Sequence, residues 1–369
     1  MNYRVAIACG GTGGHLFPGL AVADVLRQRG WKILLLVSAK QIDEVALRNY
    51  PNYEVRILST IGWPGAKSLA FINFLWRYFK SMGECCRWFK EWRPDVVLGM
   101  GGFTSAPPLR CAINRKIPTL IHESNAVPGR VTVWLSQRVD QVLLGFEACK
   151  KRLAANVKSV VTGTPLKVKP ISGDRSIILQ KLGLHSNRKT ILIMGGSQGA
   201  KALNELVVQA LRYWKEVKEL WQFVHLTGSG EKELVELNYR REGLSVKAVE
   251  FCGEMEDIYG VTDLAVSRSG AASLSELAAW EIPSFLIPFP FAAGNHQVLN
   301  AQIFTDAGAA IMREQSDLTP EKLAREIKNL LENDLLMKRM AENCKAIAIL
   351  DGAQRVAERV EALAKEKAA

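Results

Sequence analysis

The sequence lacks a long hydrophobic run. No window holds the roughly 18 nearly uncharged apolar residues that a membrane-spanning helix needs. Its seven cysteines include no Cys-x-x-Cys pair and no cluster with histidines, and their odd number rules out a complete set of internal disulfides. The N-terminal segment, MNYRVAIACGG, shows no secretory leader. These absences predict a protein of a reducing compartment that has no zinc site and meets a bilayer only through its surface.

Common nucleotide-binding signatures are also missing. Neither glycine-rich loop of the chain ends in the Gly-Lys-Ser/Thr of a P-loop. The dinucleotide fingerprint fails because Gly11-Thr12-Gly13 is followed by Gly14-His15-Leu16, and because Ser38-Ala39 stands where an acidic ribose-binding residue should follow the second strand. No Asp-x-Asp motif is present to hold a metal–diphosphate complex. The sequence therefore disfavours a nicotinamide-dependent oxidoreductase and predicts no metal or other cofactor.

Size and charge point to a large folded protein with an anionic partner. With 369 residues, of which 48% are hydrophobic, the chain is long enough for two or three domains. Lysine and arginine number 48 against 37 aspartates and glutamates, so the formal net charge is +11. Such a surface attracts nucleic acid, an acidic membrane or a phosphorylated substrate. The alternative is a basic surface that serves only solubility.

Short apolar runs alternate with amphipathic segments, a pattern typical of βαβ units and parallel sheets. A polar, turn-rich linker follows Gly163-Thr164-Pro165, and the pattern then restarts. The expected strands are 4–9, 32–37, 95–98, 119–122 and 141–144 before the linker, and 190–194, 221–226, 247–251, 264–267 and 284–287 after it. We expect helices at 18–29, opened by Pro18, at 200–215, and from Thr319 onward. The sequence thus predicts an α/β protein of two doubly wound, Rossmann-like domains, 1–163 and 164–344, facing a cleft.

The restart places a glycine-rich loop at the same point of each half. Gly10-Gly11-Thr12-Gly13-Gly14 follows the first strand, and Gly195-Gly196-Ser197-Gln198-Gly199 follows the first strand of the second half. Such a loop lets backbone N–H groups approach a phosphate, and the dipole of the following helix favours the negative charge. In open parallel sheets, ligands bind outside the carboxyl ends of the strands. A tight turn that merely needs glycine is the alternative for either loop, but the matching pair favours a phosphate-bearing ligand.

Two further features could carry chemistry in such a cleft. His15, at the junction of the first loop and its helix, could act as a general base because histidine titrates near neutrality, or it could simply hydrogen-bond to backbone. The run 266–276 opens a helix with small and hydroxyl-bearing residues and is a second candidate seat for a diphosphate. Glu276, about two turns into that helix, could accept hydrogen bonds from a ribose or could match the helix dipole.

The segment 61–93 differs from the rest in its aromatic and basic content. Apolar residues recur there at helical spacing, and they include Leu75, Trp76 and Phe79. The segment carries six lysines and arginines against two glutamates. A basic helix rich in aromatics is typical of in-plane contact with a membrane surface. The alternative is a helix whose apolar face packs on the sheet.

Together these motifs resemble those of a known family, MurG. The resemblance rests on 10–15 (Gly-Gly-Thr-Gly-Gly-His) with Pro18-Gly19-Leu20-Ala21, and then, in the same order, on Gly101-Gly102-Phe103, His122-Glu123-Ser124-Asn125, 195–200 and 267–276. MurG enzymes transfer N-acetylglucosamine from UDP-N-acetylglucosamine to undecaprenyl-diphospho-N-acetylmuramoyl-pentapeptide. The resemblance therefore implies the GT-B fold, with an acceptor- and membrane-contacting first domain and a UDP-sugar-binding second domain. A last helix, from about 345 to 369, would pack back on the first domain.

Carried over position by position, the resemblance implies contacts with the sugar donor from both halves. They would be Thr12, Gly13, Gly14, Asn125, Lys167, Ser197, Cys252, Ala271, Ala272, Ser273, Leu274, Ser275, Glu276 and Gln297, with Glu276 on the ribose and Cys252 near the uracil. Lys167 departs from the arginine frequent in the family and lacks its fork of donors. The acceptor diphosphate is expected on Gly101 and Gly102, since this loop ends a strand of the first domain.

The implied reaction is a single inverting displacement by the C4 hydroxyl of the acceptor, with UDP as the leaving group. The catalytic base would be His15, with Glu123 as the second candidate. The partners would be UDP-N-acetylglucosamine, the lipid-linked muramoyl peptide and an anionic membrane surface at the cytoplasmic face of the inner membrane, with no nucleic acid. The alternatives are a UDP-sugar transferase acting on another lipid, a non-hydrolysing UDP-sugar epimerase, or a nucleotide-sugar-binding scaffold without turnover.

Overall fold

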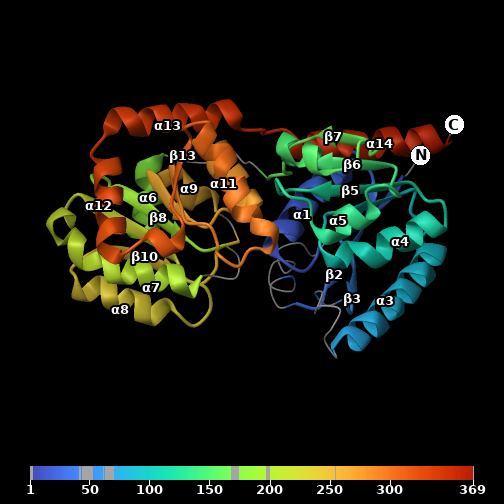
Figure 1. Ribbon diagram of the computed structural model, residues 1–369, viewed down its shortest axis with the longest axis horizontal. Coiled ribbons are helices and arrows are strands. Elements are labelled where there is room, and N and C mark those ends of the chain that lie inside the picture. The colour runs from blue at the N-terminus through green and yellow to red at the C-terminus, as the bar shows by residue number, and fades with distance from the viewer. Residues whose placement is uncertain are drawn as a thin grey trace. The chain divides into compact units, whose positions relative to one another are not determined.

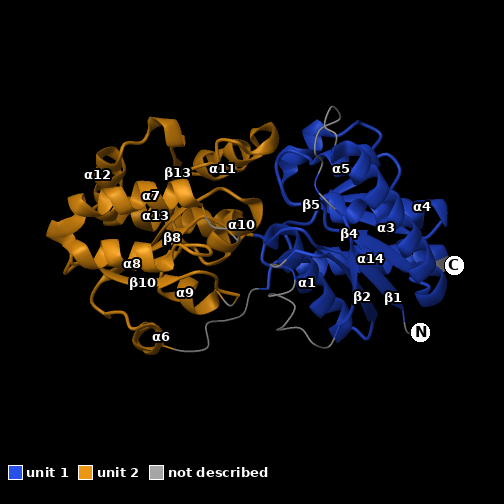
Figure 2. Ribbon diagram, turned by 90° about the horizontal axis from the view of Figure 1, so that it is seen from below, with its two compact units in different colours: residues 1–167, 349–369 blue, residues 168–348 orange. Residues whose placement is uncertain are grey.

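The computed structural model describes residues 3–40, 43, 53–60, 62, 70–167, 174–196, 200–253 and 255–368. The chain divides into two compact units, Met1–Lys167 with Ile349–Ala369, and Val168–Ala348 (Figure 2). The division follows Lys167, whereas the sequence placed it after Gly163. The chain returns to the first unit at Ile349, whereas the sequence expected a return at about residue 345.

The first unit is built on a seven-stranded parallel sheet of order β3-β2-β1-β4-β5-β6-β7 (Figure 1). Its strands are β1 Arg4–Ala8, β2 Lys32–Ser38, β3 Glu54–Leu58, β4 Val96–Gly99, β5 Thr119–Glu123, β6 Gln141–Leu144 and β7 Ser159–Val161. The sequence predicted all of them except β3 and β7. Both are edge strands, and neither shows the long apolar run of a buried strand. Most residues of β3 are exposed, and β7 is only three residues long.

Helices cover both faces of this sheet. One face carries α1 Gly13–Gln28 and α14 Gly352–Ala368, and the other carries α3 Ala70–Trp92, α4 Ala106–Asn114 and α5 Arg130–Leu135. Alternate residues of β1 enter the two cores, Val5 and Ile7 on the α1 side and Ala6 and Ala8 on the α3 side. The helix α14, from the end of the chain, lies beside α1 and completes that core (Figure 1).

Helix α1 begins earlier than its sequence predicts. Pro18 was expected to open it, but the first helical residue is Gly13, with Thr12 at the N-cap position, and Pro18 lies inside the helix. The expectation failed because two glycines in a first turn weaken the sequence signal for a helix. The earlier start places His15 in the first turn of α1.

The second unit has a six-stranded parallel sheet of order β10-β9-β8-β11-β12-β13. Its strands are β8 Lys189–Met194, β9 Trp221–Leu226, β10 Ser245–Val249, β11 Leu264–Ser267, β12 Ser284–Leu286 and β13 Ala310–Met312. The sequence predicted all except the short edge strand β13, although it placed β10 two residues too late. Two separate buried cores line this sheet, so the doubly wound α/β class is confirmed for both units.

The helices of the second unit are α6 Arg175–Leu182, α7 Lys201–Ala210, α8 Lys232–Arg241, α9 Glu256–Val261, α10 Ala271–Ala279, α11 His296–Asp306, α12 Pro320–Leu331 and α13 Asp334–Ile347. The helix expected at 200–215 is α7 followed by a 3-10 segment, Leu211–Val217. Helix α12 begins as predicted, because the Thr319 side chain accepts a hydrogen bond from the Lys322 N–H and Pro320 occupies the first turn.

Five of the seven cysteines are buried, and Cys86 and Cys252 are half-buried. Cys86 of α3 and Cys111 of α4 are paired, with their Cα atoms 5.8 Å apart, a pairing that the sequence did not indicate. The remaining cysteines are free thiols, and they are Cys9, Cys85, Cys149, Cys252 and Cys344. Burial raises the pKa of Cys344 to about 12, so this thiol is inert at neutral pH.

Candidate functional site

The carboxyl ends of neighbouring strands β1, β4 and β5 meet at one edge of the first unit's sheet, because all of its strands are parallel. Three loops leave this edge: residues 9–12 after β1, residues 100–102 after β4, and residues 124–129 after β5. Predicted site residues lie on each of these loops. The fold therefore brings together residues that are far apart in the chain.

His15 lies between the first and second of these loops. Its Nδ1 is 3.1 Å from Thr12 Oγ1. A Cβ built on Gly102 would be 2.9 Å from His15 Cε1, and one built on Gly101 would be 3.5 Å from its Nε2, so the ring covers both glycines. Both have positive φ angles, +86° at Gly101 and +66° at Gly102, which other residues rarely adopt. We call His15, Thr12, Gly101 and Gly102 the histidine cluster.

The surroundings of His15 favour its neutral form. Burial lowers the pKa of His15 below its usual value and the Lys40 ammonium acts in the same direction, whereas the Glu123 and Asp43 carboxylates oppose this shift. The neutral tautomer with hydrogen on Nδ1 donates to Thr12 Oγ1 and leaves the Nε2 lone pair free to accept a proton. The histidine cluster is therefore arranged as a general base should be.

Glu123, the second candidate base, is held by four hydrogen bonds. Its Oε1 accepts from the backbone N–H (3.1 Å) and side-chain amide (3.0 Å) of Asn125, and its Oε2 accepts from the Gly129 N–H (2.8 Å) and the Thr132 hydroxyl (2.7 Å). Only 4% of the residue is exposed. Taking up a substrate proton would cost Glu123 some of these bonds, so the geometry favours His15 as the base. Glu123 instead holds Asn125 and the loop 124–129 in place.

The structure adds Asp43 to this edge, a residue that the sequence did not single out. Asp43 is fully buried, and its Oδ2 accepts hydrogen bonds from the Gly11 N–H (2.8 Å) and from the N–H (3.0 Å) and hydroxyl (2.6 Å) of Ser38. The carboxylate thereby fastens the first glycine loop to the end of β2. The sequence offers little to mark Asp43 as a site residue. It stands five positions after Ser38, whereas a ribose-binding acid would stand directly after the second strand.

In the second unit, the start of α10 is arranged to hold an anion. The N-cap is Gly270, and its carbonyl accepts the first helical hydrogen bond from the Leu274 N–H at 2.9 Å. The N–H groups of Ala271, Ala272 and Ser273 therefore have no carbonyl partner within the helix and point out of its N-terminus. With the helix dipole, these three donors suit a phosphate group.

Two residues predicted as donor contacts do not fit this arrangement. The backbone N–H of Leu274 is already used within the helix, and its side chain is fully buried in the core. The Ser275 hydroxyl turns back along the helix and donates to the Ala271 carbonyl at 2.9 Å. Sequence resemblance marked the whole run 271–276, but helix geometry leaves only its first three N–H groups free.

Gln297 lies against the start of α10. Its Oε1 accepts from the N–H groups of Ser269 (3.3 Å) and Phe289 (2.9 Å), and the Ser269 hydroxyl donates to the Gln297 carbonyl (2.7 Å). The second glycine loop begins next to this region, because β8, which precedes Gly195, pairs with β11. Ser197 lies outside the described residues.

Glu276 and Cys252 lie in the same unit. Glu276 Oε2 accepts a hydrogen bond from the Tyr259 hydroxyl at 2.7 Å, and burial raises the pKa of Glu276 to about 7. Cys252 is half-buried, and it belongs with Tyr259 to one apolar cluster. In the described ranges, no group of three or more His, Cys, Asp or Glu side chains could hold a metal ion.

Lys167, another predicted donor contact, ends the first of the two chain segments that form the first unit. Its ammonium pairs with Asp24 of α1 at 3.0 Å. The predicted contact conflicts with this pairing, because the ammonium would have to leave Asp24 to reach a ligand.

Comparison with known proteins gives independent evidence. The models for the glycosyltransferase family 28 N-terminal and C-terminal domains match residues 5–144 and 190–359. Proteins of Thermoanaerobacter sp. (strain X514) and Halothermothrix orenii are 33% and 35% identical over 96% and 93% of this chain, and the matches cover 98% and 94% of those proteins. Both are named "UDP-N-acetylglucosamine--N-acetylmuramyl-(pentapeptide) pyrophosphoryl-undecaprenol N-acetylglucosamine transferase". A crystal structure of Acinetobacter baumannii MurG has a TM-score of 0.74 and 28% identity, and the match covers 98% of this chain and 99% of that one. The chain belongs to glycosyltransferase family 28, within the MurG family.

As a member of the MurG family, the chain has the GT-B fold that its motifs implied, with one parallel-sheet Rossmann-like unit for each of the two matched domains. The histidine cluster and Glu123 lie in the N-terminal match, which ends at residue 144. The start of α10, Glu276 and Gln297 lie in the C-terminal match.

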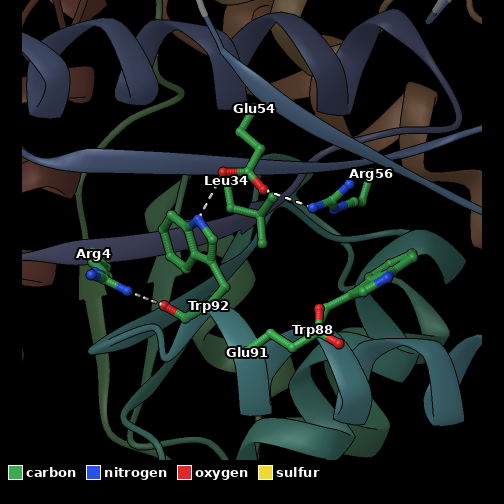
Figure 3. A pocket seen from close by; sticks show the side chains of 7 residues that line it. All are labelled: Arg4, Leu34, Glu54, Arg56, Trp88, Glu91 and Trp92. Carbon is green, nitrogen blue, oxygen red and sulfur yellow. Dashed lines mark hydrogen bonds and ion pairs between the residues drawn. The ribbon is translucent and has the colours of Figure 1, made fainter.

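The first unit of this family member also contains a partly open cavity of about 180 Å³ away from the site residues (Figure 3). Its lining comes from β1, β2, β3 and the last turns of α3, and consists of Arg4, Leu34, Glu54, Arg56, Trp88, Glu91 and Trp92. The Glu54 carboxylate there already has partners, since it accepts hydrogen bonds from Trp92 Nε1 (2.9 Å) and from the Arg56 guanidinium (3.0 Å). The cavity includes the amino-terminal residues of β1 and β3, whereas ligands of such sheets bind at the carboxyl ends. It is not the candidate active site.

The outer face of α3 exposes a row of large apolar side chains. The exposed fractions of Ile72, Trp76 and Phe79 are 72%, 59% and 60%, and Leu75 is 36% exposed. The opposite face of the helix is buried, as Phe89 at 2% shows. One face of α3 therefore packs on the sheet, and the other is exposed; contact of the exposed face with a membrane stays a prediction.

Proposed function

We propose that this member of the MurG family transfers N-acetylglucosamine from UDP-N-acetylglucosamine to undecaprenyl-diphospho-N-acetylmuramoyl-pentapeptide, the step from lipid I to lipid II in peptidoglycan synthesis. The observation that carries the proposal is the similarity, over nearly the whole chain, to transferases named for this reaction. The two units support it separately, one with a neutral histidine beside glycine loops and the other with a free helix N-terminus.

The proposed reaction is a single displacement with inversion at the anomeric carbon. The C4 oxygen of the acceptor forms a bond to C1 of N-acetylglucosamine while the bond between C1 and the phosphate oxygen of UDP breaks. Nε2 of His15 takes the hydroxyl proton, and UDP leaves with the electron pair. Such a base contributes typically ~10²–10⁴-fold in rate.

The leaving UDP gains negative charge, which needs fixed positive dipoles near it. The free N–H groups of Ala271, Ala272 and Ser273 would supply them in place of a bound cation. In this proposal Glu276 binds the ribose and Gln297 borders the diphosphate. Cys252 lies near the uracil.

The diphosphate of the acceptor would lie on the backbone of the loop after β4. Successive positive φ angles at Gly101 and Gly102 let N–H groups approach an anion without interference from a Cβ. The same loop touches the His15 ring, so an acceptor held there would have its sugar close to the base.

The decisive test is transfer of labelled sugar from UDP-N-acetylglucosamine to purified lipid-linked muramoyl pentapeptide. We expect a labelled disaccharide on the lipid in the presence of a chelator, with release of UDP. Transfer only to another lipid would indicate a related glycolipid transferase, and conversion of the donor to an epimer would indicate an epimerase. Binding of the donor without formation of either product would indicate a nucleotide-sugar-binding scaffold.

We further propose that the protein binds the cytoplasmic face of the inner membrane peripherally through α3. None of the described helices combines the length and the apolar character that crossing a bilayer would require. The exposed row on α3 lies beside basic groups, since the Lys80 ammonium is 5.3 Å from the centre of the Trp76 ring. Apolar side chains flanked by cations suit an anionic bilayer surface.

Changing Trp76 and Phe79 to serine should lower binding to anionic vesicles by roughly tenfold or more, because two large apolar side chains would no longer enter the interface. Co-sedimentation with phosphatidylglycerol-containing vesicles measures this. The matched control changes Leu234 and Leu237 to serine, two exposed apolar residues of α8 in the second unit. Equal losses in both double variants would contradict a specific role for α3.

A further inference from the structure

Tyr259 and Glu276 form a hydrogen-bonded pair in the second unit. Tyr259 lies on α9, is 4% exposed, and donates its hydroxyl to Glu276 Oε2 at 2.7 Å. Its ring packs against Trp280, just after α10, with ring centroids 6.1 Å apart. Packing therefore fixes the phenol, and the phenol presents one donor to the carboxylate.

This pairing engages one oxygen of Glu276 and leaves the other available. Within the part of the chain that the structure describes, Oε1 accepts no hydrogen bond. Glu276 is half-buried, and its Oε1 is not sealed in the protein interior, so a ligand can reach this oxygen. The N-terminus of α10, where the diphosphate is proposed to bind, belongs to the same helix.

We propose that Tyr259 is a positioning residue that orients the Glu276 carboxylate toward the ribose hydroxyls of the sugar donor. The inference rests on the proposed donor site and deepens it. A ribose offers two neighbouring hydroxyl donors, and an ionised carboxylate is purely an acceptor, so the two match. The bond from Tyr259 to Oε2 stops the carboxylate from rotating and directs Oε1 to the ligand.

Tyr259 also acts on the charge of Glu276. Burial raises the pKa of Glu276 to about 7, the hydrogen bond from Tyr259 opposes this, and the Glu256 carboxylate adds to it. Without the phenol, a larger fraction of Glu276 would be protonated at neutral pH. Burial, followed by the charge of Glu276, raises the pKa of Tyr259 well above its usual value, so the phenol remains a donor.

Other titratable groups near the pair do not remove the dependence of the Glu276 charge on Tyr259. On the side of α9, Glu256 acts on both members and Cys252 acts on Tyr259. Helices α11 and α13 also pack against α10, and their titratable groups are His296, Asp306, Asp334, Lys338, Arg339, Glu342, Cys344 and Lys345. None of these displaces the pKa of Glu276. A titration of the donor site near neutral pH therefore reports on Glu276.

The test measures the donor KM and kcat of Tyr259→Phe from about pH 6 to about pH 9. In the wild type, KM should rise as the pH falls through about 7, because protonated Glu276 loses acceptor capacity. In the variant this rise should begin at higher pH, and KM at pH 7 should be roughly fivefold higher, as the ionised fraction falls from about one half to about one tenth. Near pH 9 both proteins ionise Glu276, so the KM increase that remains there, about twofold or more, reports the lost orientation of the carboxylate alone, and the kcat of the variant should stay close to that of the wild type throughout.

Two further variants separate positioning from general damage. Tyr239→Phe removes a buried tyrosine hydroxyl in the same unit, one that lies 3.2 Å from His225 Nδ1, and should leave the pH midpoint of KM unchanged. Glu276→Gln should raise KM and remove its dependence on pH. A donor KM in Tyr259→Phe that equals the wild-type KM near pH 9, where Glu276 is ionised in both proteins, would overturn the proposal.

Calorimetric binding of UDP keeps this inference distinct from the proposed function. A wild type that binds UDP without transferring sugar would overturn the function, while the affinity for UDP would still follow Glu276 and Tyr259 across the same pH range. A wild type that binds no UDP would overturn both.

Discussion

Replacing His15 with alanine should lower kcat by roughly 10²–10³-fold and leave the donor KM within about twofold of the wild type. The loss follows from removing Nε2, the free proton acceptor of the histidine cluster. Donor binding should persist, because the proposed diphosphate seat, Ala271 to Ser273, is in the other unit. Initial rates with saturating acceptor and varied donor would give both constants.

The pH profile provides the control. A base acts only when unprotonated, and burial holds the pKa of His15 below its usual value. The wild-type kcat should therefore stay constant at neutral pH and fall only below the ordinary histidine range of about 6.5. His15→Ala should lose this acid limb along with most of its rate. An unchanged kcat would exclude His15 and return attention to Glu123, despite its four hydrogen bonds.

The sheets were predictable because a strand buried on both faces is a continuous apolar run. Strands such as β6, Gln141–Leu144, and β11, Leu264–Ser267, begin and end where the sequence predicts. The missed strands β3, β7 and β13 are edge strands, which are only partly buried. The start of α1 was missed because its first two residues, Gly13 and Gly14, have a low helix propensity.

The candidate site could be predicted where its residues stand in a local motif. His15, Gly101 and Gly102 stand in recognisable segments, and the fold joins them through adjacent parallel strands. Asp43 and Tyr259 could not be found in this way, because each acts through a hydrogen bond to a residue on another element. Their place in the candidate site can be recognised only when the position of the hydrogen-bonding partner is known.

The same limit explains why some predicted contacts change meaning. Glu123 has the chemistry of a base, but its surroundings make it an anchor for the loop 124–129. The sequence suggests that the Lys167 ammonium contacts the donor, but in the fold this ammonium pairs with the Asp24 carboxylate. Resemblance transfers residue types, whereas protonation and pairing depend on the neighbours that the fold supplies.

Changing Gly102 to alanine should lower kcat by roughly 10²-fold and raise the acceptor KM, with the donor KM unchanged. A Cβ at this position would lie 2.9 Å from His15 Cε1 and 3.1 Å from Nδ1, so the imidazole would have to move. Movement of the ring breaks its contact with Thr12 and misplaces Nε2. The backbone at φ 66° and ψ 175° is also unfavourable for alanine, which would disturb the N–H groups proposed for the acceptor diphosphate.

Gly30→Ala separates backbone strain from displacement of the histidine. Gly30 follows α1 in the same unit, has φ +83°, and has no atom within 4 Å of the place that a Cβ would occupy. Both variants should lose about 1–3 kcal/mol of stability from the positive φ, measurable by urea unfolding. Only Gly102→Ala should lose turnover, because only there does the methyl group meet the imidazole. Equal kcat losses in the two variants would trace the effect to strain, whereas full activity in Gly102→Ala would show that the ring of His15 can shift without cost to catalysis.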